Sequence, residues 1–136
     1  MKVVVDNNVL ISAYLLKAIS LPADVILLCE SKGWTVVLSE DMLIEFIDVV
    51  TRKFRSFGPE SIKAIVAGFR EDFEVVNPTV SLDMEVPDPD DRMLFECAFF
   101  AGAEVIVTGD KRLWKVDTKG ADLKVMSPRQ FIETYS

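Results

Sequence analysis

Short apolar runs alternate with amphipathic stretches along the whole length of this chain. Residues 2–5 form a β-branched run that ends at an aspartate, and similar runs lie at 34–38, 73–76, 104–108 and 123–126. Short, continuous apolar runs of this kind are typical of strands that are buried on both faces of a parallel sheet. The pattern therefore predicts about five strands in one mainly parallel sheet.

The stretches between these runs have helical periodicity, and several carry helix start or stop signals. Ser39 is a favoured N-cap residue, and Pro22 and Pro128 suit the first turn of a helix. Lys32-Gly33 is a typical helix end, whereas the polar, proline-containing stretch 77–89 fits a surface loop. The predicted helices cover residues 9–14, 22–32, 40–54, 60–72, a segment from Asp90-Asp91 to Ala101, and the residues after Ser127.

Strands that alternate with helices predict an α/β fold in which helices cover both faces of the sheet, that is, a three-layer α/β/α sandwich. The length of 136 residues fits a single domain over residues 1–136. In such sheets ligands bind beyond the carboxyl ends of the strands. Candidate functional residues are therefore sought at those ends.

Composition favours a soluble cytoplasmic protein. The apolar start is cut at once by Asp6-Asn7-Asn8, so we expect no signal peptide, and no apolar run approaches the roughly 20 residues of a membrane span. Cys29 and Cys97 each fall within a helical apolar pattern, which predicts two buried thiols. Half of the residues are apolar and nine are phenylalanine, which favours a homodimer that buries some of them.

The chain contains no histidine. This absence excludes Ser-His-Asp and Cys-His triads, histidine proton shuttles and histidine-ligated zinc. Carboxylates remain, and their oxygens suit Mg²⁺ or Mn²⁺, which polarise phosphoryl oxygens and activate water. A metal-dependent phosphodiesterase is the leading hypothesis from composition.

Three acids lie where a ligand site is expected. Asp6 closes the first predicted strand, Asp110 follows the fourth by two residues, and Asp91 begins the helix that precedes the fourth. Simpler explanations remain open for each, because Asp and Asn also serve as helix caps and turn residues. Glu45 lies on the polar side of its helix, and periodicity alone does not distinguish it from an ordinary exposed glutamate.

Charge decides little. The net charge of −7 argues mildly against a nucleic-acid partner, because such proteins usually carry a basic footprint. The basic residues are nevertheless bunched at 52–55 and again just past Asp110, and either bunch also fits a solvated face. The second bunch comprises Lys111, Arg112, Lys115 and Lys119.

Four segments carry a family resemblance: Val-Val-Asp-Asn-Asn-Val-Leu-Ile-Ser-Ala at 4–13, Leu-Ile-Glu-Phe around Glu45, Pro-Asp-Pro-Asp-Asp-Arg at 87–92, and Ile-Val-Thr-Gly-Asp-Lys-Arg-Leu at 106–113. In this order and spacing they resemble the PIN-domain ribonucleases, most closely the toxin-like branch that pairs with antitoxins of the VapBC kind. The resemblance implies an acidic site for one or two Mg²⁺ or Mn²⁺ ions, built from Asp6, Glu45, Asp91 and Asp110. It is the only firm reason to select Glu45.

The same resemblance implies hydrolysis of single-stranded RNA, which leaves 5′-phosphate ends, and an antitoxin as protein partner. Asn7, Asn8, Asp90 and Thr108 are then candidate supporting residues, and Lys111 and Arg112 are candidates to hold substrate phosphates.

The chain departs from the family pattern at two positions. Asn7 stands where the family usually has Thr or Ser, so its amide is the candidate substitute for a hydroxyl that orients Asp6 or a water. Arg112 replaces an additional Asp, which favours a single ion. Both changes keep open an alternative from another class, a catalytically weak or inactive PIN-like module that binds protein or RNA. A phosphoacceptor domain ranks lower, because Asn8 and Asn77 occupy positions where such domains need an acid.

Overall fold

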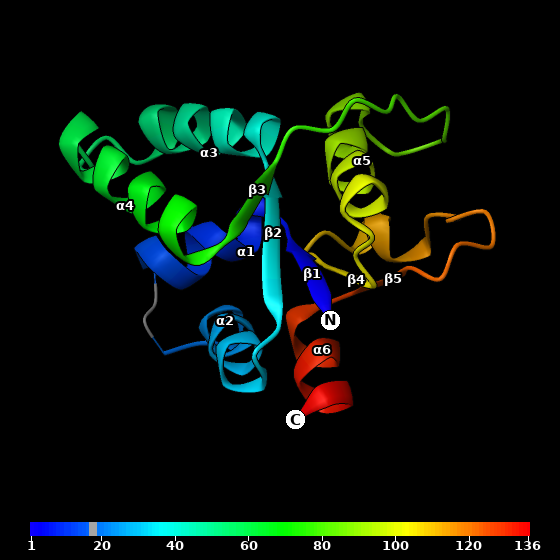
Figure 1. Ribbon diagram of the computed structural model, residues 1–136. Coiled ribbons are helices and arrows are strands. Elements are labelled where there is room, and N and C mark those ends of the chain that lie inside the picture. The colour runs from blue at the N-terminus through cyan, green and yellow to red at the C-terminus, as the bar shows by residue number, and fades with distance from the viewer. Residues whose placement is uncertain (17–18) are drawn as a thin grey trace.

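The predicted parallel sheet is confirmed. A computed structural model of the chain describes residues 1–16 and 19–136, and the described strands form one sheet in the order β3-β2-β1-β4-β5 (Figure 1). Each neighbouring pair in this sheet is parallel. The strands are β1 (Lys2–Val5), β2 (Thr35–Ser39), β3 (Glu74–Val76), β4 (Val105–Val107) and β5 (Lys124–Met126).

The helices also lie where the periodicity predicts them. Within the described residues, Ser39 and Ser127 act as N-caps, because their hydroxyls accept hydrogen bonds from the backbone N–H groups of Met42 (3.2 Å) and Gln130 (3.0 Å). The helices are α1 (Asn7–Ile11), α2 (Leu21–Lys32), α3 (Glu40–Lys53), α4 (Pro59–Asp72), α5 (Arg92–Ala101) and α6 (Pro128–Tyr135). A π-helical segment η1 (Ser12–Leu16) follows α1, and two 3₁₀ segments are η2 (Pro89–Asp91) and η3 (Lys111–Lys115).

Two local predictions need correction. The first helix does not continue as an α-helix to Tyr14, because the chain changes to η1 at Ser12. The segment after Asp110 forms η3, which the sequence did not predict, since a short 3₁₀ turn has no amphipathic periodicity to detect. The loop predicted at 77–89 contains no described helix or strand before Pro89.

Helices cover both faces of the sheet, as the three-layer prediction requires. Figure 1 shows α5 on one side of the strands and α2 with α6 on the other, while α3 and α4 extend together beyond one end of β2. Within the described part of the chain, no single helix is long and apolar enough to cross a membrane. One strongly bent pair, 7–16 with 21–32, passes that test by length and composition alone.

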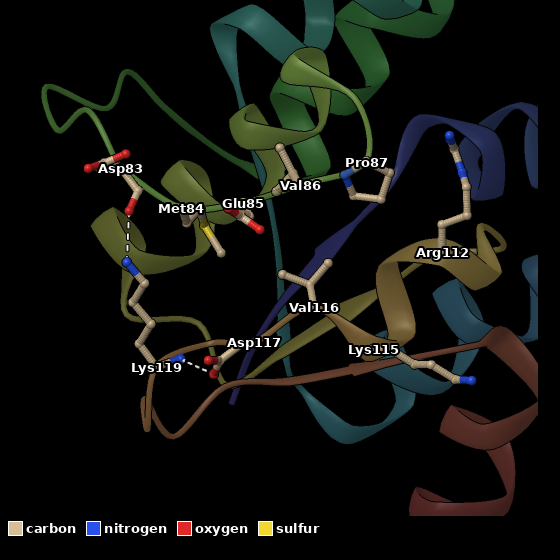
Figure 2. A pocket seen from close by; sticks show the side chains of 10 residues that line it. All are labelled: Asp83, Met84, Glu85, Val86, Pro87, Arg112, Lys115, Val116, Asp117 and Lys119. Atoms are coloured by element: carbon tan, nitrogen blue, oxygen red, sulfur yellow. Dashed lines mark hydrogen bonds between the residues drawn. The ribbon is translucent and has the colours of Figure 1, made fainter.

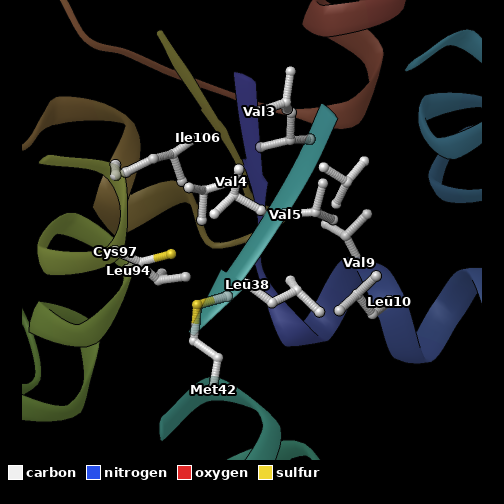
Figure 3. Packing of buried hydrophobic residues seen from close by; sticks show 14 of the residues in the cluster. Val3, Val4, Val5, Val9, Leu10, Leu38, Met42, Leu94, Cys97 and Ile106 are labelled. Atoms are coloured by element: carbon white, nitrogen blue, oxygen red, sulfur yellow. The ribbon is translucent and has the colours of Figure 1, made fainter. Parts of the chain in front are cut away.

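The core is built from the two faces of the central strands. Val4 packs toward Ile106, Leu94 and Cys97, whereas Val5 points to the opposite face, toward α1 (Figure 3). This alternation follows from the period of two along a strand, and it explains why both faces of β1 carry apolar residues. Cys97 and Cys29 are free and buried, which confirms the prediction of two buried thiols.

Val4→Ala should destabilise the fold by about 2 kcal/mol, because it removes buried methyl groups and leaves a cavity between β1 and α5. Val4 is 0% exposed, so the packed residues around it can fill the space of the lost methyl groups only in part. Urea unfolding measures the effect as a lower midpoint with an unchanged m-value. Val80→Ala, at a loop position that is 42% exposed, is the control and should leave the midpoint in place.

Candidate acidic site at the carboxyl ends of the central strands

The site lies where the strand order reverses. The chain begins in the middle of the sheet at β1, adds β2 and β3 on one side and β4 and β5 on the other. The carboxyl ends of β1 and β4 therefore lie next to each other with their following loops diverging, which is the geometry at which α/β sheets bind ligands. Val5 pairs with Val107, and the backbone N–H of Asp6 donates to the Val107 carbonyl at 2.9 Å.

Asp6 is held by hydrogen bonds from α1 and from the segment that follows β4. Its Oδ2 accepts the Thr108 hydroxyl at 2.7 Å and the Asn8 amide at 3.2 Å. Although Asp6 occupies the N-cap position of α1, its side chain makes no capping hydrogen bond. Capping therefore does not explain this carboxylate.

The pKa of Asp6 is raised to about 6, mainly by burial and to a smaller extent by the negative charges of Glu45 and Asp91. The Thr108 hydroxyl and the backbone N–H of Asn7 oppose this effect by donating hydrogen bonds to the carboxylate. A carboxylate in such surroundings is stabilised by any cation that reaches it.

Asn7 aims Glu45 at the site. Its Nδ2 donates to the Met42 carbonyl at 2.9 Å and to Oε1 of Glu45 at 3.0 Å, which joins α1 to α3. Glu45 is consequently half-buried, whereas Asp48 on the same helix is exposed and pairs with Arg52. Glu45 is thus not an ordinary exposed glutamate.

The expected role of the Asn7 amide needs correction. Its side chain contacts Glu45 instead of Asp6, and Thr108 supplies the hydroxyl that holds Asp6. The Oδ1 atom of Asn7 is buried and accepts no hydrogen bond within the described structure. An acceptor oxygen therefore lies beside Glu45 without a donor, in a position where a cation or a water would satisfy it.

Asp91 and its neighbours form a capping box. Asp88 accepts a hydrogen bond from the backbone N–H of Asp90 at 3.0 Å, and Oδ2 of Asp91 accepts one from the backbone N–H of Asp88 at 3.2 Å. Burial raises the pKa of Asp91, and the charges of Asp110 and Asp88 add to this rise. The carboxylate of Asp91 thus has a structural role and also faces other acids.

Asp110 is paired with an arginine. Arg112 donates through Nε to Oδ1 at 3.1 Å and through Nη2 to Oδ2 at 2.7 Å, so both carboxylate oxygens are engaged. This guanidinium holds the pKa of Asp110 below its ordinary value. The backbone N–H of Asp110 donates to the Thr108 hydroxyl at 3.1 Å, and Trp114, which the sequence did not single out, donates its indole N–H to the Thr108 carbonyl at 2.9 Å.

The four acids are electrostatic neighbours without converging on one point. The charges of Glu45 and Asp91 act on Asp6, and that of Asp110 acts on Asp91. Over the residues that the structure describes, no three Asp, Glu, Cys or His side chains are close enough together to hold an ion. Carboxylate oxygens are the donors that a hard divalent cation prefers, but Asp6, Glu45 and Asp91 would have to move closer together to share one, and Asp110 would first have to be released by Arg112.

Residues 2–112 match the family model described as "PIN domain". The chain belongs to the PIN-domain family. No curated protein matches the sequence. Among solved structures, the PIN-domain chain is similar to a chain in the crystal structure of VapBC2 from Rickettsia felis bound to a DNA fragment from their promoter, with a TM-score of 0.67 and 14% sequence identity. The match covers 93% of this chain and 98% of that chain, which establishes a shared fold.

Asp6→Asn should stabilise the metal-free PIN domain at pH 7.5, on the order of 2 kcal/mol, and lose this advantage by pH 4. The pKa of Asp6 rises from 3.8 to about 6 on folding, so the stability from its protonated form is fully present below pH 3.8 and is lost as the pH rises through about 6. Urea unfolding in EDTA at both pH values measures the difference. Asp122→Asn, at an exposed loop position, is the control. A destabilising effect of Asp6→Asn at pH 7.5 contradicts the prediction.

Proposed function

We propose that this PIN domain is a Mg²⁺- or Mn²⁺-dependent endoribonuclease that hydrolyses phosphodiester bonds of single-stranded RNA. The observation that carries the proposal is the buried carboxylate of Asp6 at the place where the strand order reverses. Its pKa is raised to about 6, and the charges of two further acids contribute to that rise. Such an anionic centre destabilises the protein unless it serves a cation. Membership of the PIN-domain family supports nuclease chemistry at this place.

Asp6, Glu45 and Asp91 would hold the cation, and Asp110 would join them. A cation held by these residues would supply the chemistry of water activation and of charge stabilisation at the departing 3′ oxygen. Thr108 and Asn8 keep the carboxylate of Asp6 oriented through their hydrogen bonds.

The remaining named residues support these acids. Asn7 keeps Glu45 directed toward Asp6, and Asp90 donates its backbone N–H within the capping box that holds Asp91. Lys111 is exposed and follows Asp110 directly, which suits it to contact a phosphate of the strand.

The proposal includes a place in a toxin–antitoxin pair. The structural likeness to a chain of the VapBC2 complex supports an antitoxin partner for this PIN domain. The cytoplasm is the proposed location of both proteins. A homodimer is proposed as well, because Tyr14, Leu16, Ile19 and Leu27 expose apolar surface around the start of α2.

One observation favours a second candidate function, a PIN-like module that binds RNA or protein without turnover. Arg112 engages both oxygens of Asp110, so the fourth acid is neutralised within the chain itself. A module of this kind binds Mn²⁺ weakly or not at all. Calorimetric titration of Mn²⁺ into the purified chain separates the two functions directly.

Cleavage of a labelled single-stranded RNA should require a divalent cation. We expect cleavage in Mn²⁺, none in EDTA, and a loss of at least about 100-fold on Asp6→Asn, because the substitution removes the central ligand. Gel analysis of the products measures the rate and identifies 5′-phosphate ends. Equal cleavage in Mn²⁺ and EDTA, or full activity of Asp6→Asn, overturns the proposed function.

Glu45→Gln should lower the affinity for Mn²⁺ by at least about 10-fold, because it removes the charge next to Asp6. The amide oxygen still accepts the hydrogen bond from Asn7, so the fold is preserved. Asp48→Asn is the matched control, since it removes one acid from the exposed face of the same helix. Titration calorimetry compares the two variants, and equal affinities would assign no metal-binding role to Glu45.

A further inference from the structure

A cavity of about 710 Å³ is lined in part by Arg112, the partner of Asp110. It lies between the loop 83–87 and the segment 112–119, and its volume falls in the range of small-molecule sites, which is about 300–1,000 Å³. The loop is tied in place, because the Met84 carbonyl accepts a hydrogen bond from Nε of Arg92 at 3.2 Å and the Asp83 carbonyl accepts one from Nζ of Lys119 at 2.9 Å. The cavity is therefore a built feature of the surface.

The basic side chains at the two ends of this cavity differ in whether they already have hydrogen-bond partners. Figure 2 shows Arg112 and Lys115 at one end, Lys119 with Asp83 and Asp117 at the other, and an apolar wall of Val86, Pro87 and Val116 between them. Lys119 is engaged by hydrogen bonds at its end. Lys115 has no hydrogen bond or ion pair with any residue in the described ranges 1–16 and 19–136, so its ammonium is available to an anion.

Arg112 belongs to the cavity and to the acidic site at once. It lines the cavity, and its guanidinium forms the paired hydrogen bonds with Asp110. The side chain of Arg112 is 61% exposed, so solvent screens its attraction to Asp110 and leaves its N–H groups open to a competing anion. A phosphate matches the same fork of N–H donors, so it can compete with Asp110 for this arginine.

We propose that Arg112 is a positioning residue that transfers from Asp110 to a phosphate of the RNA strand when the strand occupies this cavity. The transfer frees both oxygens of Asp110 for the divalent cation. The inference rests on the proposed function and deepens it, because it makes strand binding and cation binding mutually reinforcing. Any such coupling is reciprocal, so the cation must also tighten the strand.

Removal of Arg112 distinguishes the proposed transfer from a purely static role for this residue. If Arg112 only held Asp110 in a productive orientation, its removal would weaken cation binding. If Arg112 competes with the cation, its removal strengthens cation binding in the absence of RNA. The two roles therefore predict opposite signs for one variant.

The test is titration calorimetry of Ca²⁺, a hard cation that also prefers oxygen ligands, into the full chain with and without decauridylate. The strand should tighten Ca²⁺ binding by the wild type about fivefold or more, which is the lower range of coupling between two sites. Arg112→Ala should bind Ca²⁺ more tightly than the wild type without the strand, by a similar factor, and gain nothing further from it. Gel analysis of the recovered strand confirms that it stays intact.

Three further variants control the interpretation. Lys115→Ala should weaken strand binding and leave the affinity for Ca²⁺ without the strand unchanged. Arg112→Lys keeps the charge and loses the fork, so it should fall between the wild type and Arg112→Ala. Arg55→Ala removes an equal charge just beyond the C-terminal end of α3, whereas Glu45 lies in the N-terminal half of that helix, and should behave as the wild type.

The outcomes separate the inference from the function on which it rests. Weaker or unchanged Ca²⁺ binding by Arg112→Ala overturns the transfer, while Mn²⁺-dependent cleavage by the wild type leaves the nuclease function standing. Absence of Ca²⁺ and Mn²⁺ binding in every folded variant, with native circular dichroism, overturns both.

Discussion

The site depends on the pairing of β1 with β4. Because a slip of one residue would bring the charged Lys2 or Asp6 to a position now filled by a buried valine, the apolar core favours the register with Val5 opposite Val107. The residues that follow the two strands, Asp6 and Thr108, are then forced together, and their hydrogen bond of 2.7 Å is the result. The valines that stabilise the fold thus also position the central carboxylate.

This positioning has an energetic cost. Burial raises the pKa of Asp6 to about 6, so near neutral pH the protein holds an ionised group that its surroundings disfavour. The neighbouring acids increase the cost, and the apolar core offsets it. A bound cation would relieve this cost, and for that reason the arrangement supports the proposed cation dependence.

The sequence predicts the parts of this arrangement that local pattern controls. β-Branched runs identify the strands, serines identify helix starts, and acids directly after strands identify Asp6 and Asp110. Glu45 is beyond such reasoning, since its direction depends on the contact between Asn7 and Met42, which are 35 residues apart. The predicted contact of the Asn7 amide with Asp6 was wrong for the same reason, because its side chain bonds instead to Met42 and Glu45 of α3.

The charges divide the site into two halves with different roles. Asp110 has a guanidinium partner and a lowered pKa, whereas Asp6 and Asp91 have raised pKa values and no basic partner within hydrogen-bonding distance in the described structure. A cation gains most where negative charge is uncompensated, so it is attracted first toward Asp6 and its neighbours. In the proposed function, Asp110 would complete the coordination only when Arg112 pairs with another anion. The substitution of arginine at this position therefore makes completion of the site depend on what binds beside it.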